Sequence, residues 1–426
     1  SYGSPQAFTM SEPLMDMMAE ELGMDPFEFR YKNICREGET NINSYVYPQY
    51  PMEKIMDTMR PIYEKAVADA KAADTPEKRR GVGLAWGGFN VTEGGSDSAE
   101  VSIELMPGGK IRKYDTWHAM GQGATTGSLV VTLEALKELK LTPEDIQLIQ
   151  NDTKICPDTG MAGASRSLYM DGHATKIAAD KLLAAMRKED GTFRTYEEMK
   201  AEGIETKYLG RYETSVTPGL CRLDPNTGIG DPTPAFTYCL NLAEVDTKTG
   251  KTTVLKFTCV DFVGRIANID AVNGQAYSGI MHSIGFALKE DYHDVKKHAN
   301  MFGAGTSYIK DVPDDITLVH IDGAISDGPW GSSGASEAFQ ASGHCAVLNG
   351  IYNACGVRIH EMPALPEKVK AGLDAIEKGE KPYAPKKYFL GSDMYEELEN
   401  IKENPVQVGS VSFYVSLDDP TAERPF

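Results

Sequence analysis

Three glycine-rich segments, residues 120–123, 158–166 and 328–337, limit what this chain can fold into. Each leads from a predicted strand towards a predicted helix. A glycine-rich turn that opens a helix presents unpaired backbone N–H groups and a positive helix end, which suit anionic or acceptor-rich ligands. Any one of these turns alone is better explained as a tight connection between a strand and a helix. Three together, without a G-x-G-x-x-G motif after a first strand and without a P-loop lysine, favour a large cofactor held outside a Rossmann unit.

The N-terminal part of the chain has helical patterns. Ser11 is placed as an N-cap before Pro13 and a series of apolar residues at 3.6-residue spacing, and Gly23 predicts the end of that helix. A second short helix is predicted from Asp25, and a third over residues 51–72. The apolar series of the first helix is Leu14, Met17, Met18 and Leu22.

After residue 81 strands alternate with helices. A charged segment over residues 187–206 interrupts the pattern, and the tail after Pro363 begins as a helix and then alternates over 406–415. This order predicts an α+β fold with several lobes. We expect a helical end of a first lobe over 1–80, a second lobe over 81–362, and a charged extension over 363–426. Strands 99–105 and 111–117 are predicted to form one hairpin, and strands 238–246 and 252–261 a second one. The other predicted elements are strands 82–86, 146–149 and 316–321, and helices following 123, near 168–187, at 270–289 and from 337 through 357.

Composition excludes several classes of partner and site. A net charge of -19 argues against nucleic acid or an anionic membrane, because binding phosphates requires clustered Lys and Arg. No apolar run approaches the about 20 residues that cross a bilayer, so we expect a cytoplasmic protein. Seven cysteines without a C-x-x-C pair, and eight histidines without metal-ligand spacing, give no iron–sulfur or zinc site.

Glu337 is the candidate catalytic residue. It follows Gly334, Ala335 and Ser336 at the start of an apolar helix. A carboxylate there complements the helix dipole, which is the simpler interpretation. At the end of a loop of small residues it is also able to approach a reacting group closely and act as a general base. Spacing alone does not decide between the two.

Short motifs spread over residues 1–373 resolve this choice. They are Ser1-Tyr2-Gly3-Ser4-Pro5-Gln6, Leu22-Gly23-Met24-Asp25-Pro26, Met120-Gly121-Gln122-Gly123, Gly163-Ala164-Ser165-Arg166, residues 328–337, Gly356-Val357-Arg358-Ile359 and Leu365-Pro366-Glu367-Lys368-Val369. In order and approximate spacing they resemble the C-terminal half of the molybdopterin-binding subunit of molybdenum hydroxylases, the xanthine oxidase family. The chain is most similar to the bacterial aldehyde oxidoreductases of that family.

The resemblance implies a molybdopterin-binding fold and assigns roles to particular residues. Glu337 is the general base beside a molybdenum ion that the pterin holds, with no direct protein ligand to the metal. Two departures add a small side chain near the cofactor, because relatives often have Gly-x-Gly-Glu at the Glu337 loop and Gly-Gly-Ser at the Ser165 loop. The cofactor-binding residues implied are Gly121, Gln122, Gly123, Gly163, Ala164, Ser165, Arg166, Gly334, Ala335 and Ser336, and the substrate-pocket residues are Tyr2, Trp86, Phe89 and Glu93.

The resemblance also implies an activity and partners. The expected reaction is oxidation of an aldehyde to a carboxylic acid, with water as the oxygen source and a molybdopterin cytosine dinucleotide as the cofactor. Electrons then pass to 2Fe–2S clusters, with or without FAD, on partner domains or subunits. Hydroxylation of an aromatic N-heterocycle, such as nicotinate or a purine, and a non-catalytic scaffold role are the alternatives. Because the chain opens at Ser1 in the middle of the family pattern, we expect it to need the N-terminal half of the molybdenum domain in a hetero-oligomer.

Overall fold

The computed structural model describes most of the chain between Gly3 and Glu380. By its internal contacts the chain separates into two compact units, which meet between Pro382 and Tyr383. The helices and strands named in this section belong to the first unit. The boundaries at 80 and 362 stay a prediction, and the alternating segment 406–415 lies outside the described residues. The described residues are 3–40, 47, 49–91, 97–150, 152–214, 234–325, 328–380, 400 and 402–404.

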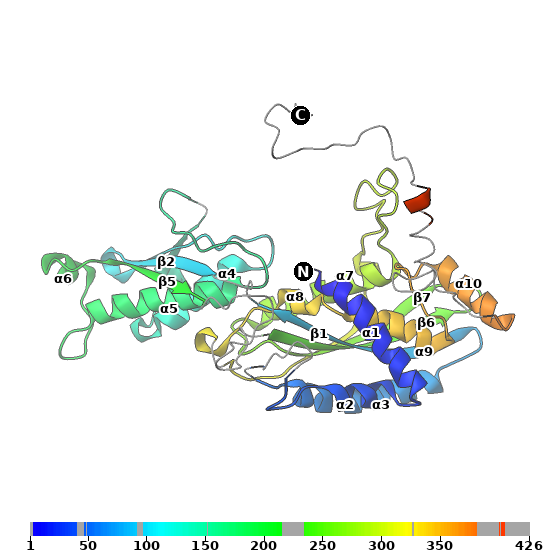
Figure 1. Ribbon diagram of the computed structural model, residues 1–426. Coiled ribbons are helices and arrows are strands. Elements are labelled where there is room, and N and C mark those ends of the chain that lie inside the picture. The colour runs from blue at the N-terminus through cyan, green and yellow to red at the C-terminus, as the bar shows by residue number, and fades with distance from the viewer. Residues whose placement is uncertain are drawn as a thin grey trace. The chain divides into compact units, whose positions relative to one another are not determined.

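One four-stranded sheet has the order β1-β6-β7-β8, and its layers are visible in Figure 1. Pairing is antiparallel from β1 through β6 to β7, and parallel between β7 and β8. The second hairpin predicted from the sequence, β6 with β7, is therefore confirmed. The strands are β1 Lys78–Asn90, β6 Pro234–Asp246, β7 Thr252–Phe262 and β8 Asp315–His320.

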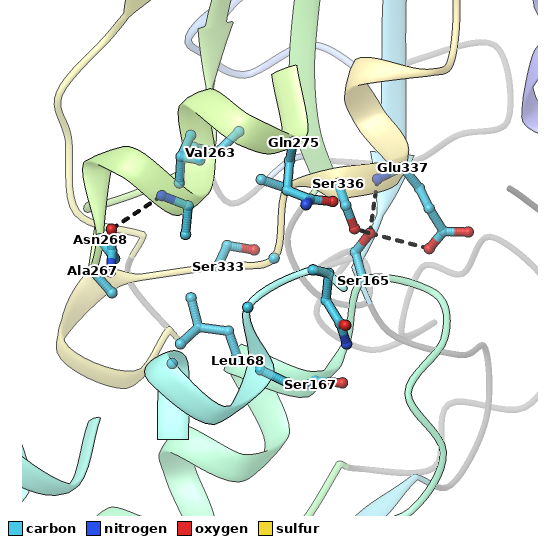
Figure 2. Close-up of a pocket in the computed structure, with 18 of the residues that line it drawn as sticks. Ser165, Ser167, Leu168, Val263, Ala267, Asn268, Gln275, Ser333, Ser336 and Glu337 are labelled. Atoms are coloured by element: carbon cyan, nitrogen blue, oxygen red, sulfur yellow. Dashed lines mark hydrogen bonds between the residues drawn. The ribbon is translucent and has the colours of Figure 1, made fainter. Parts of the chain in front are cut away.

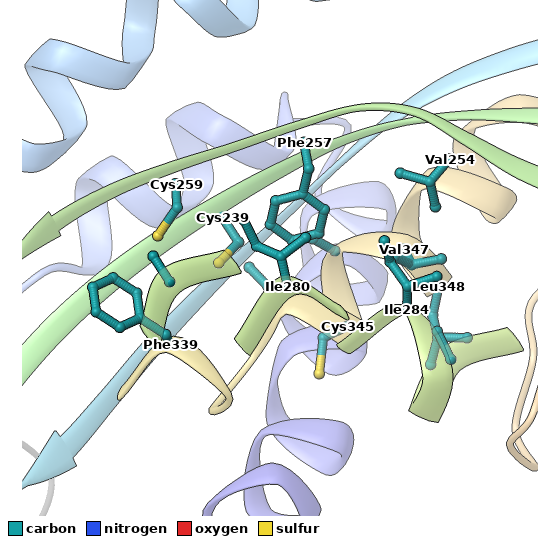
Figure 3. Close-up of a cluster of buried hydrophobic side chains, with 14 of the residues drawn as sticks. Cys239, Val254, Phe257, Cys259, Ile280, Ile284, Phe339, Cys345, Val347 and Leu348 are labelled. Atoms are coloured by element: carbon teal, nitrogen blue, oxygen red, sulfur yellow. The ribbon is translucent and has the colours of Figure 1, made fainter. Parts of the chain in front are cut away.

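Strand β6 is buried on both faces, and alternate residues belong to different hydrophobic clusters. Tyr238 and Leu240 pack with α2 (Pro26–Asn33) and α3 (Met52–Ala72). Cys239 packs in the cluster of α7 (Ile269–Leu288) and α9 (Gly343–Cys355), whose side chains Figure 3 shows around Phe257. Because neighbouring side chains of a strand point to opposite faces, the sheet lies between two layers of helices.

Helix α9 lies directly on β1. A Cβ added to Gly83 would lie 1.9 Å from the Ala346 carbonyl oxygen, so only glycine allows this approach. The amide Nδ2 groups of Asn349 and Asn353 donate to the carbonyls of Leu84 and Val82, at 3.0 and 2.8 Å. Among the strands that the structure describes, β1 has β6 as its single neighbour, and the Asn side chains pair with carbonyls on its other edge.

A second four-stranded sheet has the order β4-β3-β2-β5, with β2–β3 and β2–β5 antiparallel and β3–β4 parallel. Helix α5 packs on β2 and β5. The β2–β3 hairpin is confirmed, whereas β5 at the end of the charged segment was not predicted. The elements are β2 Ser98–Leu105, β3 Ile111–Tyr114, β4 Ile146–Ile149, β5 Lys207–Glu213, α4 Ala124–Ala135, α5 Ser167–Met186 and α6 Tyr196–Ala201. Short 3-10 helices are η1 Pro107–Gly109, η2 Lys137–Leu139, η3 Pro143–Asp145, η4 Ile309–Asp311 and η5 Pro329–Gly331, and α10 is Pro366–Glu377.

The first helix departs from its predicted start. Helix α1 covers Ser4–Glu21, so the start predicted at Ser11 is wrong. Pro5 stands in the first turn, where a missing N–H costs nothing, and Pro13 lies inside the helix. The helix buries Glu12 and Asp16, while the apolar series Leu14, Met17, Met18 and Leu22 is exposed.

Buried charge explains this inverted pattern. The Arg30 guanidinium of α2 is 1% exposed and contacts the carboxylates of Glu12 and Asp16 at 3.0 and 2.6 Å. Glu12 also accepts the backbone N–H of Trp86 in β1 at 3.0 Å. Burial raises the pKa of Glu12 above its ordinary value, and the neighbouring Arg30 guanidinium offsets part of this increase. The polar face of α1 is thus its packed face, because the ion cluster joins α1, α2 and β1.

The predicted helix from 337 through 357 is broken in two. Helix α8 covers Ser336–Phe339 and α9 begins at Gly343. The break brings Gly343 against α7, where an added Cβ would lie 2.5 Å from Ser283 Oγ. No described helix is both long enough and apolar enough to span a bilayer.

His344 ties the start of α1 to α9. The ring is fully buried, with Nε2 2.7 Å from Thr9 Oγ1 and 3.1 Å from the Pro5 carbonyl. Nδ1 has no hydrogen-bond partner among the described residues. Burial lowers the pKa of His344 to about 4, because the charged ring would lose its hydration.

We predict that stability depends on pH through His344. An unfolded His binds a proton below about pH 6.5, whereas the folded His344 stays neutral until about pH 4. Above pH 6.5 the protonation of His344 therefore does not reduce the free energy of unfolding. As the pH falls towards 4, the free energy of unfolding decreases by up to about 3 kcal/mol, because only the unfolded state takes up the proton. Urea unfolding of His344→Gln across this range should show a weaker loss than the wild type. Exposed His293→Gln is the control, and an unchanged pH slope in His344→Gln would contradict the assignment.

Candidate active site

A cavity of about 420 Å³ is lined by parts of four segments, residues 117–127, 162–168, 263–275 and 333–340. Two segments come from the second sheet's layer and two from the first. Figure 2 shows labelled residues from three of them around the same space. The three glycine-rich segments of the sequence all contribute. The lining includes Glu337, the predicted catalytic residue, and seven of the predicted cofactor-binding residues: Gln122, Gly123, Gly163, Ser165, Gly334, Ala335 and Ser336.

The first loop is shaped by Gln122. Its Oε1 accepts the Met120 N–H at 2.6 Å, and its Nε2 donates to the His118 carbonyl at 3.0 Å. Gly123 then adopts a φ of 87° as the N-cap of α4. The side chain of Gln122 closes its own loop, and the loop leads into the N-terminus of α4. Gly121, with a φ of 107°, is outside the lining, so its role in cofactor binding stays a prediction.

Arg166 forms the base of the second loop. Its Nε and Nη2 donate to the Asp97 carboxylate, and its remaining N–H groups donate to the carbonyls of Ser98, Thr159 and Met161. The guanidinium is 1% exposed and does not line the cavity. These contacts use all five donors to hold the loop against β2. A direct contact between the Arg166 side chain and a cofactor therefore stays a prediction without support from this geometry, and Ala164 is likewise outside the lining.

The second and third loops meet at Ser165. Its Oγ accepts the Glu337 N–H at 3.0 Å and lies 3.1 Å from Glu337 Oε2 and 3.2 Å from Ser336 Oγ, as the dashed lines of Figure 2 show. A Cβ added to Gly334 would lie 1.7 Å from the Ser165 carbonyl oxygen. The half-buried carboxylate of Glu337 thus stands in the cavity lining, at the contact between the layers of the two sheets.

The fourth segment was missed by the sequence analysis. Gly264 and Arg265 follow β7, and the Asn268 side chain accepts the Ala271 N–H at 3.1 Å as the N-cap of α7. Arg265 and Gln275 bring a positive charge and an amide to the lining. The available signal was the same strand-to-helix pattern as in the other three segments, with Asn268 as the cap.

The chemistry of the lining suits a flat polar cofactor. Ser333 Oγ and Trp117 Nε1 belong to buried residues of the lining, and neither atom has a hydrogen-bond partner within the described ranges. Buried polar groups are rarely left unpaired, so a ligand group or an ordered water would be expected as the partner of each atom. The openings of α4 and α7 add backbone N–H donors, and Arg265 adds charge for a phosphate. The residues fit a molybdopterin group.

Two of the four predicted substrate-pocket residues, Trp86 and Phe89, are described by the structure. Trp86 stacks on Tyr238, with ring centroids 4.7 Å apart, and Phe89 packs against the cluster of α7 and α9. Neither lines the cavity. Tyr2 and Glu93 lie outside the described residues. A substrate role for these four residues stays a prediction.

A second cavity of about 610 Å³ adjoins the first through Gln340, which lines both. Gln340 follows Glu337 by about one helical turn. The walls include the aromatic rings of Phe286 and Tyr292 and the carboxyl group of Glu290. Burial raises the pKa of Glu290.

We predict that Gly334→Ala disrupts the contact between the two loops. The new Cβ would overlap the Ser165 carbonyl, and overpacking of this kind costs about 1–3 kcal/mol. Gly274→Ala is the control, because its Cβ would meet nothing within 4 Å inside α7, and such a change stabilises a helix by about 0.5–1 kcal/mol. Urea unfolding and hydrogen exchange of the 163–166 loop measure both effects. Equal stability of the two variants would show that the loops do not need this approach.

Comparison with known proteins agrees with this geometry. Two models described as molybdopterin cofactor-binding domain match residues 1–34 and 59–313. The chain is 39% identical over 376 residues to an aldehyde oxidoreductase of Megalodesulfovibrio gigas, covering 88% of this chain and 41% of the relative. The aldehyde oxidoreductase structure from Desulfovibrio desulfuricans superposes with a TM-score of 0.82 at 42% identity, covering 87% of this chain and 40% of that one.

More distant relatives extend the picture. A probable hypoxanthine oxidase of Escherichia coli is 25% identical over 419 residues, covering 88% of this chain and 42% of the relative. The chain thus spans about two fifths of the length of these relatives. The predicted α+β molybdopterin-binding fold is confirmed by the superposition. With its glycine-rich loops around one cavity and Glu337 in the lining, this chain belongs to the molybdopterin cofactor-binding domain family of molybdenum oxidoreductases.

Proposed function

We propose that this chain binds a molybdopterin cytosine dinucleotide and, as part of a larger enzyme, oxidises an aldehyde to the carboxylic acid. The observation that carries the proposal is the Glu337 carboxylate, held by Ser165 in the wall of a cavity with unpaired polar groups. The aldehyde is favoured as substrate because the relative at 39% identity is named an aldehyde oxidoreductase.

Three kinds of group on this chain would hold the cofactor. Gly123 and Gly163 line the cavity and leave room for a ligand to approach the backbone closely. Ser333 Oγ and Trp117 Nε1 would receive the partners they lack. Arg265 and the N-terminus of α7 would face phosphate groups. When bound, the molybdenum cofactor supplies a Lewis acid and an acceptor for two electrons.

Glu337 would provide the proton chemistry. In the overall reaction an aldehyde and water give a carboxylic acid, two protons and two electrons. The oxygen derived from water becomes nucleophilic only when its proton is removed, and the Glu337 carboxylate would accept that proton. A positioned general base contributes typically about 10² to 10⁴ in rate. Ser165 would keep Glu337 Oε2 at the cavity wall while this occurs.

The electrons must leave through another polypeptide segment. We propose that iron–sulfur clusters, with or without a flavin, receive them on a part that corresponds to the remaining three fifths of the relatives. The exposed apolar face of α1 supports such a neighbour. Met10 and Leu22 are 73% and 63% exposed there, and such contiguous apolar surface is typical of an interface.

We predict that Glu337→Gln abolishes turnover and leaves the cofactor bound. The amide has nearly the same shape but cannot accept the proton, so the reductive half-reaction should slow by about 10² to 10⁴. The measurement is rapid-mixing reduction of the loaded complex by aldehydes, nicotinate and a purine, with molybdenum content determined in parallel. The surface variant Glu367→Gln is the control.

Each result has a clear meaning. A Glu337→Gln complex with full molybdenum content and near wild-type reduction rates would remove Glu337 from the mechanism. Faster reduction of the wild type by nicotinate or a purine than by any aldehyde would overturn the substrate assignment. A wild-type complex that contains no molybdenum would favour the scaffold alternative.

We also predict that the chain requires its neighbour for loading. Expressed alone it should contain no molybdenum and show no turnover, whereas co-expression with the polypeptide that carries the remaining parts should restore both. Met10→Lys should weaken co-purification, because a charge is placed on the exposed apolar face. A chain purified alone with full molybdenum content and activity would refute the requirement. Lys65→Met, an exposed change on α3, is the control for co-purification.

A further inference from the structure

We infer that Ser165 is a positioning residue, whose side-chain hydroxyl serves Glu337 rather than the cofactor. The hydroxyl fixes the carboxylate at the cavity wall in the orientation that a base requires. The base role rests on the function proposed above. The placement of the carboxylate by Ser165 rests only on the contacts in this structure and can be tested separately.

The first argument is the hydrogen-bond capacity of one hydroxyl group. It has one proton to donate and two lone pairs to accept with. Ser165 Oγ accepts the Glu337 N–H at 3.0 Å, so its proton is directed to Glu337 Oε2 at 3.1 Å. The Ser336 hydroxyl, 3.2 Å away, then acts as the donor to the second lone pair. The Ser165 hydroxyl is thereby saturated by the Glu337 loop, as Figure 2 shows.

The second argument is the backbone at this position. Ala164 and Ser165 both have a φ of 50°. This is the left-handed region of backbone conformation, which residues other than Gly and Asn rarely adopt. Two such residues in succession are unfavourable unless surrounding contacts hold them. Here the Ser165 carbonyl is pressed against Gly334 while the hydroxyl reaches Glu337. The chain thus keeps an unfavourable conformation at the one place where it directs a donor to the candidate base.

The contacts also distinguish Ser165 from its neighbours in the loop. The Arg166 side chain is occupied by Asp97 and by carbonyls. Gly163 offers only its backbone to the cavity. A bound cofactor would meet this loop through its backbone, and the Glu337 carboxylate would keep its partner whether the cofactor is present or not.

The test uses substitutions that respect the backbone. Ser165→Gly removes the hydroxyl and tolerates a φ of 50°, so the loop should fold without loss of stability. Lys140→Gly is the control, because Lys140 is an exposed residue with a φ of 53° far from the cavity and gains the same backbone freedom. Ser165→Ala removes the same group but retains the Cβ atom, and Ser165→Cys restores a weak donor.

The first readout does not involve turnover. In crystal structures of the cofactor-free chain, Ser165→Gly and Ser165→Ala should show the Glu337 carboxylate displaced or in several rotamers. Lys140→Gly should show it in place. An unmoved and well-ordered carboxylate in both Ser165 variants would overturn the inference.

The second readout is kinetic, in the loaded complex and per molybdenum. Ser165→Gly and Ser165→Ala should lower kcat about 10- to 100-fold with little change in KM, the factor expected when one hydrogen bond to a charged group is lost. Ser165→Cys should recover part of the rate. Combined with Glu337→Gln, Ser165→Gly should cause no further decrease, because it acts through Glu337. A further decrease of similar size, or a rate equal to that of Lys140→Gly, would overturn the inference.

Failure of the proposed function would appear differently. If Glu337→Gln alone reduced at the wild-type rate while the carboxylate moved in Ser165→Gly, then the positioning contact would stand and the base role would fall. If Glu337→Gln was slow but Ser165→Gly neither moved the carboxylate nor slowed the reaction, then the proposed function would stand and the role of Ser165 would fall.

Discussion

The contact between the Ser165 loop and the Gly334 loop is the constraint on which the candidate site depends. The first loop opens α5 of one sheet's layer and the second opens α8 of the other. They approach so closely that a single added carbon at residue 334 would overlap a carbonyl oxygen. The placement of Glu337 follows from this approach, and each of the two loops contributes part of the cavity lining. Glycine at 334 is therefore required by the neighbouring backbone, whereas a flexible turn alone would tolerate other residues.

Buried charge organises the other end of the first sheet's layer. Arg30 neutralises Glu12 and Asp16, and Glu12 in turn binds the backbone of β1 at Trp86. A charge cluster of this kind contributes little net stability compared with apolar residues, but it penalises any packing that leaves one member unpaired. That penalty fixes which face of α1 is inward. The exposed methionine and leucine face is the consequence, and it offers surface to a further polypeptide.

Local patterns predicted much of the fold and part of the site. Glycine and proline turns, strand alternation and capping residues placed α2, α3, both hairpins and the helices after the glycine-rich loops. Glu337 was singled out by its loop of small residues and assigned as a base by the family resemblance, and seven of the ten cofactor-binding residues that the resemblance implied line the cavity. The errors had local causes too. Pro13 resembled a helix start, and residues 337–357 carried one continuous apolar pattern although the helix breaks before Gly343.

By itself the sequence determined which segments could bind a cofactor and which carboxylate could serve as a base, because turn chemistry and helix openings are properties of a few neighbouring residues. Only the tertiary structure decided how those segments meet. It turned Arg166 inward to Asp97, directed the Ser165 hydroxyl to Glu337 and added the Arg265–Asn268 segment to the lining. It also stacked Trp86 on Tyr238 and packed Phe89 against the cluster of α7 and α9, so that neither lines the cavity. These outcomes depend on contacts between residues far apart in the chain, whose hydrogen bonds and excluded volume no local pattern contains.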